Sequence, residues 1–144
     1  MYLRKCHGCL VFFFVCLIFC SARNIYADEK QMDNVKTIVI HFEDNGKELE
    51  VNCGDVIQIE LEGLGSAGYW WYIDSLDHNY YEVLSEETKK LTQEVLGAPV
   101  LGIWRLITKK HGWTEIRMHC YRKWEGIEKS VKHFSITVNI KRGL

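Results

Sequence analysis

From Val35 to the end of the chain, apolar residues alternate with polar residues at a period of two. The clearest run is residues 55–62, in which Ile57, Ile59 and Leu61 alternate with glutamine and glutamate. A period of two places successive side chains on opposite faces of a β-strand, whereas an amphipathic helix needs a period near 3.6. No helical period interrupts this region. The pattern therefore predicts an all-β domain.

Turn residues divide the alternating region into short strands. Asn45-Gly46 is typical of a β-hairpin and predicts that the strands on its two sides pair with each other. The charge run at residues 86–90 is interpreted as a solvated loop. About seven to eight short strands at regular spacing favour an antiparallel β-sandwich of the immunoglobulin-like type. The predicted strands are residues 35–42, 49–51, 55–62, 69–74, 80–85, 101–109, 113–121 and 131–141.

The N-terminal 27 residues differ in composition from the rest. Arg4 and Lys5 precede residues 10–20, an apolar run without a charge, and small residues follow up to Ala22 and Ala27. This arrangement predicts a secretory signal peptide, residues 1–22 or 1–27, because a membrane-spanning helix would need roughly 20 apolar residues. We therefore expect a secreted or periplasmic protein with one mature domain, residues 28–144, and no membrane anchor.

The charged residues of the mature region are scattered and nearly balanced. The whole chain has 18 lysines and arginines against 19 aspartates and glutamates. A surface for nucleic acid or an anionic membrane would need basic residues gathered in a patch or stripe, and the sequence has none. We expect neither partner, and we expect the protein to be monomeric.

Cys53 and Cys120 are the two cysteines that follow the predicted signal peptide. Trp71 lies between them in the sequence, which invites comparison with the disulfide of immunoglobulin domains. Cys53, however, belongs to the far end of its strand, whereas Cys120 lies a few residues from the opposite end. Their separation should exceed roughly 15 Å, while a disulfide needs Cα atoms within about 7 Å. We predict two free, buried thiols.

No motif indicates catalysis, a cofactor or a metal centre. Residues 63–68 have the G-x-G-x-x-G spacing, but that fingerprint needs a helix after its third glycine, and Tyr69 instead begins a strand. His119 and Cys120 are neighbours on one strand, so they point to opposite faces and cannot pair as base and nucleophile. His119 and His133 are predicted to face each other across a hairpin. Without a third ligand, they are interpreted as a solvated cross-strand pair.

The most distinctive stretch is a small-residue loop at 63–68, the first loop, which leads directly into the aromatic run Tyr69-Trp70-Trp71. Small side chains let another molecule approach the backbone closely, and loops held by rigid strands commonly carry binding sites. If alternate connections of the sandwich lie at opposite ends, the first loop shares one end with a middle loop at 96–100 and a third loop at 122–130. These three loops form the predicted binding surface.

Three motifs occur in order along these loops: Gly68-Tyr69-Trp70-Trp71, Gly97-Ala98-Pro99 and Tyr121-Arg122-Lys123-Trp124-Glu125. Their order and separation resemble the chagasin-type inhibitors of papain-family cysteine proteases, over about residues 36–141. The chain departs from that family's pattern in its first loop, where Leu64-Gly65-Ser66-Ala67 replaces the usual Asn-Pro-Thr-Thr. It also has Lys123 where proline is usual.

The resemblance implies a reversible, non-covalent inhibitor that is not an enzyme and uses no cofactor. The first loop would enter the cleft of a papain-family cysteine protease, and the other two loops would hold its walls. Trp124 would supply a large rigid contact and Arg122 a fork of hydrogen-bond donors. A secreted immunoglobulin-like module that binds another protein or a glycan is the alternative. The implied binding residues are Gly65, Ser66, Ala67, Gly68, Tyr69, Gly97, Ala98, Pro99, Arg122 and Trp124.

Overall fold

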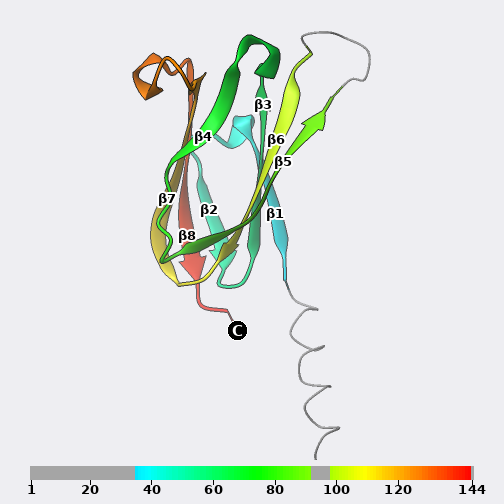
Figure 1. Cartoon of the computed structure of the whole chain (residues 1–144). Helices are drawn as coiled ribbons and strands as arrows, with labels where there is room; N and C mark the ends of the chain where they lie inside the picture. The colour runs from blue at the N-terminus through cyan, green and yellow to red at the C-terminus, as the bar shows by residue number, and fades with distance from the viewer. Residues whose placement is uncertain (1–34, 92–97, 144) are drawn as a thin grey trace, which may run out of the picture. The chain divides into compact units, whose positions relative to one another are not determined.

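The computed structural model describes residues 35–91 and 98–143, so the predicted signal peptide and Gly97 lie outside the described residues. The described residues form two four-stranded sheets, with the strand orders β1-β3-β6-β5 and β2-β8-β7-β4 (Figure 1). The predicted immunoglobulin-like β-sandwich is confirmed. Its strands are β1 (Thr37–His41), β2 (Glu48–Asn52), β3 (Val56–Gly63), β4 (Tyr69–Ser75), β5 (Tyr81–Lys90), β6 (Val100–Thr108), β7 (Gly112–Arg122) and β8 (Lys132–Lys141).

The core lies between the two sheets and is built from alternate side chains of each strand. In β3, Ile57, Ile59 and Leu61 are at most 1% exposed, whereas the residues between them are partly open to solvent. Apolar burial of this kind is the main favourable contribution to folding. The other largest fully buried side chains are Trp71, Trp104, Tyr81, Phe134, Leu106, Ile116, Met118, Ile136 and Ile140.

The first two strands do not pair with each other. β1 pairs in parallel with β3, and β2 pairs in parallel with β8, so each sheet is antiparallel apart from one edge strand. The hairpin predicted at Asn45-Gly46 is therefore wrong. A 3-10 turn, η1 (Phe42–Asp44), and the Asn-Gly pair instead carry the chain from one sheet to the other.

Asn45 and Gly46 form a turn, closed by the N–H of Lys47 donating to the carbonyl of Asp44 at 3.0 Å, and this turn also binds the edge of β8. The Asn45 side chain donates to the carbonyl of His133 at 3.0 Å and accepts from the backbone N–H of Ser135 at 2.8 Å. The backbone N–H of Gly46 donates to the carbonyl of Ser135 at 2.8 Å. These three hydrogen bonds hold the turn against β8, while the strands on its two sides join different sheets.

Residues 86–90 belong to β5, so their interpretation as a loop is wrong. They continue the antiparallel pairing with β6 until Lys90 lies opposite Val100. Every side chain in this run is exposed, because β5 is an edge strand and its outer half extends past the buried core. Charged residues at an exposed edge also discourage pairing with strands of other molecules.

The helices among the described residues are three short 3-10 turns, η1, η2 (Gly65–Ala67) and η3 (Ile127–Lys129). Across 35–91 and 98–143, none of them has the length and apolar character needed to cross a membrane. η2 lies in the first loop and η3 in the third loop. The helical turns are thus concentrated in connections and leave the sandwich itself all-β.

Cys53 and Cys120 are both free, as predicted. Cys120 is 4% exposed, and burial raises the pKa of its thiol. Cys53 is only half-buried, and its Sγ donates to the carbonyl of Lys109 at 3.0 Å. The prediction of buried thiols therefore holds for Cys120 and fails for Cys53, which lies in the turn that follows β2 and not within a sheet.

Candidate functional site

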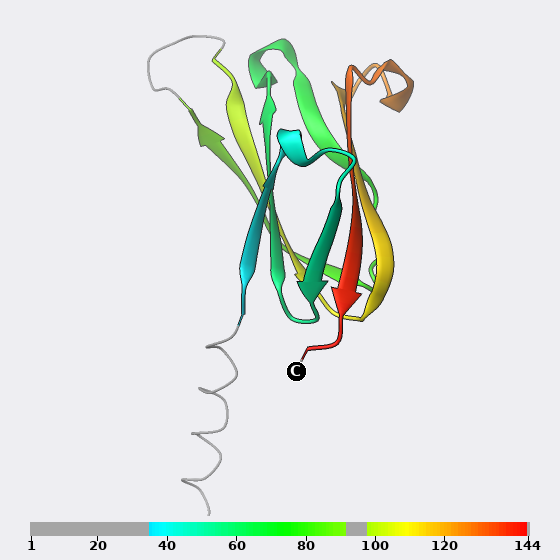
Figure 2. The same ribbon diagram turned by 180° about the vertical axis from the view of Figure 1, so that it is seen from behind.

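The first loop, the third loop and the described ends of the middle loop lie at one end of the sandwich (Figure 1; Figure 2 shows the same end from behind). Gly63 at the end of β3 and Lys90 at the end of β5 are both opposite Val100 at the start of β6. In the other sheet, Tyr69 at the start of β4 is opposite Arg122 at the end of β7. The first loop, the described part of the middle loop and the third loop therefore form one tip, as predicted.

The first loop is a tight turn closed by its own backbone. The N–H of Ala67 donates to the carbonyl of Leu64, and the N–H of Gly68 donates to that of Gly65, both at 2.9 Å. Gly68 then adopts a φ of +80°, which glycine tolerates far better than other residues, and Tyr69 begins β4. Because a strand follows Gly68, the helix that a dinucleotide-binding turn requires is not formed here.

Trp124 of the third loop lies against Gly68 of the first. A Cβ at position 68 would come within 2.0 Å of Cη2 of Trp124, so the indole takes the space that any side chain there would need. The Trp124 side chain is nevertheless 71% exposed. The indole therefore contacts the first loop with one edge and presents most of its apolar surface to solvent.

Arg122 joins the first and third loops. Its Nε donates to the carbonyl of Ala67 at 2.9 Å, and its Nη1 lies 3.1 Å from a carboxylate oxygen of Glu125. The guanidinium also lies 4.5 Å from the centroid of the Tyr69 ring, within the range of cation–π attraction. Much of the donor fork predicted to face a partner is thus directed at the protein's own loops.

Two tryptophans fix the base of the first loop to the sandwich. Trp71 is 1% exposed, and its Nε1 donates to the carbonyl of Glu62 at 2.9 Å. Trp70 packs so closely on Gly63 and Gly102 that a Cβ on either residue would lie within 3.0 Å of its ring. The small residues of the first loop allow many backbone conformations, but the packing of Trp70 and Trp71 holds its base in place.

The remaining predicted site residues fall at the same tip, apart from Gly97. Gly65, Ser66 and Ala67 are exposed, and Ala98 and Pro99 are half-buried just before β6. The Cγ2 of Val100 lies 3.5 Å from the position that a Cβ on Gly65 would occupy, so the start of β6 touches the first loop. The described residues of the three loops thus form a continuous surface.

Sequence reasoning did not count Glu125 as a site residue, although it belongs to the third motif. Its carboxylate holds the guanidinium of Arg122, which in turn holds the first loop. Opposite charges three residues apart in a turn were the signal that could have identified this pair. The contact between Trp124 and Gly68 left no comparable signal, because the two residues are far apart in the sequence.

Residues 50–138 match the family model described as "Chagasin family peptidase inhibitor I42". The chain belongs to the chagasin family. Chagasin-family proteins are peptidase inhibitors and not enzymes, which agrees with the resemblance noted in the loop motifs. A comparison with curated protein sequences gives no match.

Two solved structures are similar to this chagasin-family chain. The cysteine protease inhibitor EhICP2 from Entamoeba histolytica has a TM-score of 0.69 at 21% identity, and the match covers 75% of this chain and 98% of that one. Amebosin has a TM-score of 0.55 at 19% identity, with 74% of this chain and 98% of that one covered. At these identities the likeness shows a shared fold, and it extends over almost the full length of both neighbours.

Proposed function

We propose that this protein is a reversible, non-covalent inhibitor of papain-family cysteine proteases, which it blocks by placing three loops in the active-site cleft. Membership of the chagasin family supports peptidase inhibition. The cysteine-protease class is supported by the three loop motifs and by the likeness to EhICP2, itself a cysteine protease inhibitor. The observation that carries the proposal is the contact between Trp124 and Gly68, which joins two of the loops into one surface.

The exposed part of the first loop consists of small residues. Gly65, Ser66 and Ala67 have little side-chain bulk, so their backbone can come close to the catalytic groups of a protease. The exposed indole of Trp124 then offers apolar surface for one wall of the cleft. Blocking of this kind needs shape and burial, and no bond has to form.

The positions of the thiols agree with a non-covalent mode of binding. Cys53 lies in the turn after β2 and contacts Lys109, at the end of the sandwich away from the three loops. Cys120 is near the tip in sequence but is buried, and its raised pKa disfavours the reactive thiolate. Neither described thiol can therefore reach the catalytic cysteine of a bound protease without unfolding.

Contacts within the tip take the place of the rigid residues that the family's first loop usually has. This chain lacks the usual proline and asparagine, and its glycines alone would leave the loop mobile. The hydrogen bond from Arg122 to the carbonyl of Ala67 and the packing of Trp124 on Gly68 restrict it instead. A loop ordered before binding loses less conformational entropy in the complex, which favours affinity.

The decisive experiment is a titration of papain with the purified protein, using a fluorogenic substrate. We expect competitive inhibition, full recovery of papain activity on dilution, and an inhibitor of unchanged mass. Trypsin, a serine protease, serves as the control and should keep its activity. Failure to inhibit papain with the inhibitor in large excess, or a covalent adduct in the mass spectrum, would contradict the proposal.

We further propose that the protein is exported, to the periplasm or the exterior of the cell, with loss of residues 1–22 or 1–27. The support is the charged start, the apolar run and the small residues that follow it. N-terminal sequencing of the exported protein should give a first residue between Arg23 and Asp28. An exported protein that retains Met1 would refute this.

A further inference from the structure

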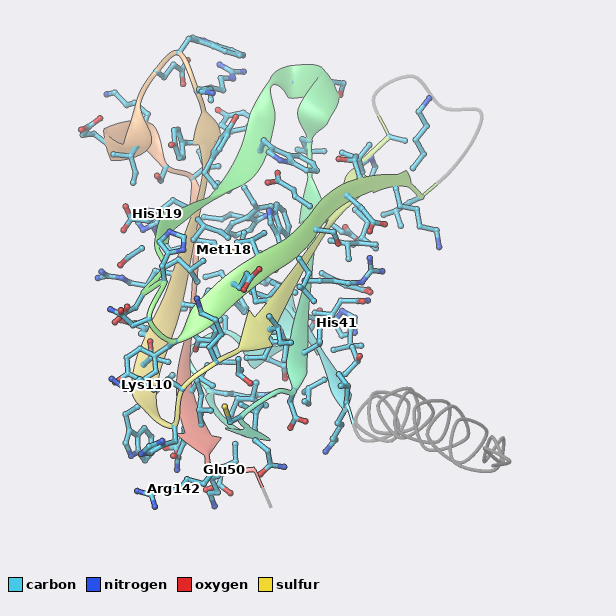
Figure 3. The ribbon with its side chains drawn as sticks, turned by 60° about the horizontal axis from the view of Figure 1, so that its bottom comes forward. His41, Glu50, Lys110, Met118, His119 and Arg142 are labelled. Atoms are coloured by element: carbon cyan, nitrogen blue, oxygen red, sulfur yellow. The ribbon has the colours of Figure 1, made fainter. Side chains whose placement is uncertain are left out.

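His119 of β7 and His133 of β8 face each other on the outer side of the β2-β8-β7-β4 sheet, as their predicted pairing required. Their Nδ1 atoms lie 3.0 Å apart, and the two rings are nearly perpendicular, at 83°. The neighbouring Met118 is buried in the core, whereas His119 points away from it (Figure 3). The sequence indicated a solvated pair, but the structure shows two nitrogens in direct contact.

Two ring nitrogens at this distance need a hydrogen atom or a metal ion between them. Two lone pairs would repel each other, and so would two N–H groups. In the absence of a metal, a hydrogen bond from the N–H of one neutral ring to the lone pair of the other satisfies the pair. A metal ion that displaces this proton would bind both nitrogens, and their spacing indicates which metal ions fit.

The spacing of the two nitrogens favours ions with ligands at right angles. Nitrogens that are each about 2.0 to 2.1 Å from a metal lie about 2.9 Å apart at a right angle and roughly 3.3 Å apart at a tetrahedral angle. The 3.0 Å between the Nδ1 atoms of His119 and His133 is nearer the first value. Square-planar or octahedral ions that prefer imidazole, such as Ni²⁺ and Cu²⁺, fit this geometry better than Zn²⁺ does.

Asp74 of β4 stands on the other side of the His119 ring. Its Oδ2 lies 3.7 Å from Nε2, the nitrogen that does not face His133. A carboxylate beside one imidazole nitrogen favours a proton there, which leaves the lone pair on the other nitrogen free to bind a metal. The His119 side chain is only 22% exposed, so it loses little hydration when an ion binds. Ser130 Oγ, 3.5 Å from Nδ1 of His119, adds an oxygen near the position.

We propose that His119 and His133 form a two-histidine site for a divalent transition-metal ion, with water as the remaining ligands. Among the residues that the structure describes, no set of three or more histidine, cysteine or carboxylate side chains is arranged to hold a metal. The site is therefore open and weaker than a four-ligand structural centre. β7 leads into the third loop and β8 leaves it, so a bound ion would link the two strands at the base of the loop that carries Trp124.

Calorimetric titration of the untagged protein with nickel chloride and with copper chloride tests this site. We expect one ion per chain and a higher melting temperature when the ion is present. Papain inhibition is not the readout, because both ions bind the protease's own thiol. His119→Ala and His133→Ala should each abolish binding, and Asp74→Asn should weaken it by roughly tenfold, the effect typical of removing a group that orients a ligand.

His111→Ala is the matched control, since His111 is an exposed histidine in the β6–β7 turn at the opposite end of the sandwich. It should bind the ion as the unaltered protein does. Melting without metal verifies that each variant is folded, and His119→Gln and His133→Gln replace the alanine variants if those unfold. The proposal is overturned if neither ion binds, if either folded single variant still binds, or if His111→Ala loses binding to the same extent.

Discussion

The indole of Trp124 occupies the space beside Gly68 that a side chain at position 68 would need, with 2.0 Å between Cη2 and the position of a Cβ. Gly68 also has a φ of +80°, a conformation that costs other residues strain. Position 68 therefore requires glycine for two independent reasons, one conformational and one steric. The two reasons can be separated by experiment, because the chain contains another glycine that has only the first.

Trp124→Ala should weaken papain inhibition far more than it lowers stability. The exposed indole offers a large apolar contact, and loss of such an anchor typically costs about 2 to 4 kcal/mol, or roughly 30- to 1000-fold in the inhibition constant. Its 71% exposure predicts a stability loss below about 1 kcal/mol. Inhibition constants and thermal melting of the same preparations test whether Trp124→Ala loses more binding free energy than folding free energy. An equal loss in both would place Trp124 among the structural residues.

Gly68→Ala should lower inhibition by displacing Trp124, and Gly46→Ala is its matched control. Gly46 has a φ of +78°, but nothing lies within 4 Å of where its Cβ would be. Both variants should lose about 1 kcal/mol or more of stability through the strained backbone, while only Gly68→Ala should inhibit papain less well. In a double-mutant cycle, Gly68→Ala should add little to Trp124→Ala, since both disturb one contact. Full additivity would show that the two residues act independently.

Arg122→Lys should not preserve inhibition, although it keeps the positive charge. Lysine cannot reproduce the Nε hydrogen bond to Ala67 together with the guanidinium packing on Tyr69. A hydrogen bond from a charged group is worth about 1.5 to 3 kcal/mol, so we expect roughly 10- to 100-fold weaker inhibition with faster dissociation. Lys123→Ala, which removes a neighbouring exposed charge, should have little effect. Full activity of Arg122→Lys would mean that charge alone matters.

The two described thiols should react with an aromatic disulfide reagent in two phases. Cys53 is half-buried and should be modified in the native protein. Cys120 is buried and its thiol pKa is raised, so it forms little thiolate and should react mainly after denaturation. Cys53→Ser should remove the fast phase and leave the slow one. A single phase, or a fast phase that survives in Cys53→Ser, would contradict the assigned burial.

The strands could be predicted from the sequence because burial on one face imposes a period of two, as residues Ile57, Ile59 and Leu61 illustrate. The pairing of the first strands could not. Asn45-Gly46 is a strong local hairpin cue, but β8 offers this pair three hydrogen bonds from residues that are 88 to 90 positions away. The local turn forms, but tertiary contacts that no local pattern records decide which strands pair on its two sides.

The interpretation of the charge run at 86–90 as a loop fails for a related reason. Charged side chains favour solvent, but they do not prevent a segment from forming a strand. The part of an edge strand that extends past the core buries neither face, so its sequence shows no alternation of apolar and polar residues. At the tip, topology was enough to bring the loops together. The contacts that individual side chains make at the tip were not predictable. Those of Arg122 with Ala67 and of Trp124 with Gly68 join residues more than fifty positions apart.

The parallel pairing of β2 with β8 has a consequence for the order in which the molecule can form. Lys141 in the last strand bonds to Glu50 in the second, 91 residues earlier, and the whole of β2 has its sheet neighbour there. During synthesis, β2 therefore has no strand to pair with until β8 has emerged from the ribosome. Such distant pairing slows folding, since the long intervening segment must be closed first. A chain cut short before β8 would lack the strand that joins β2 to β7, and would not complete the sheet that positions Arg122 and Trp124.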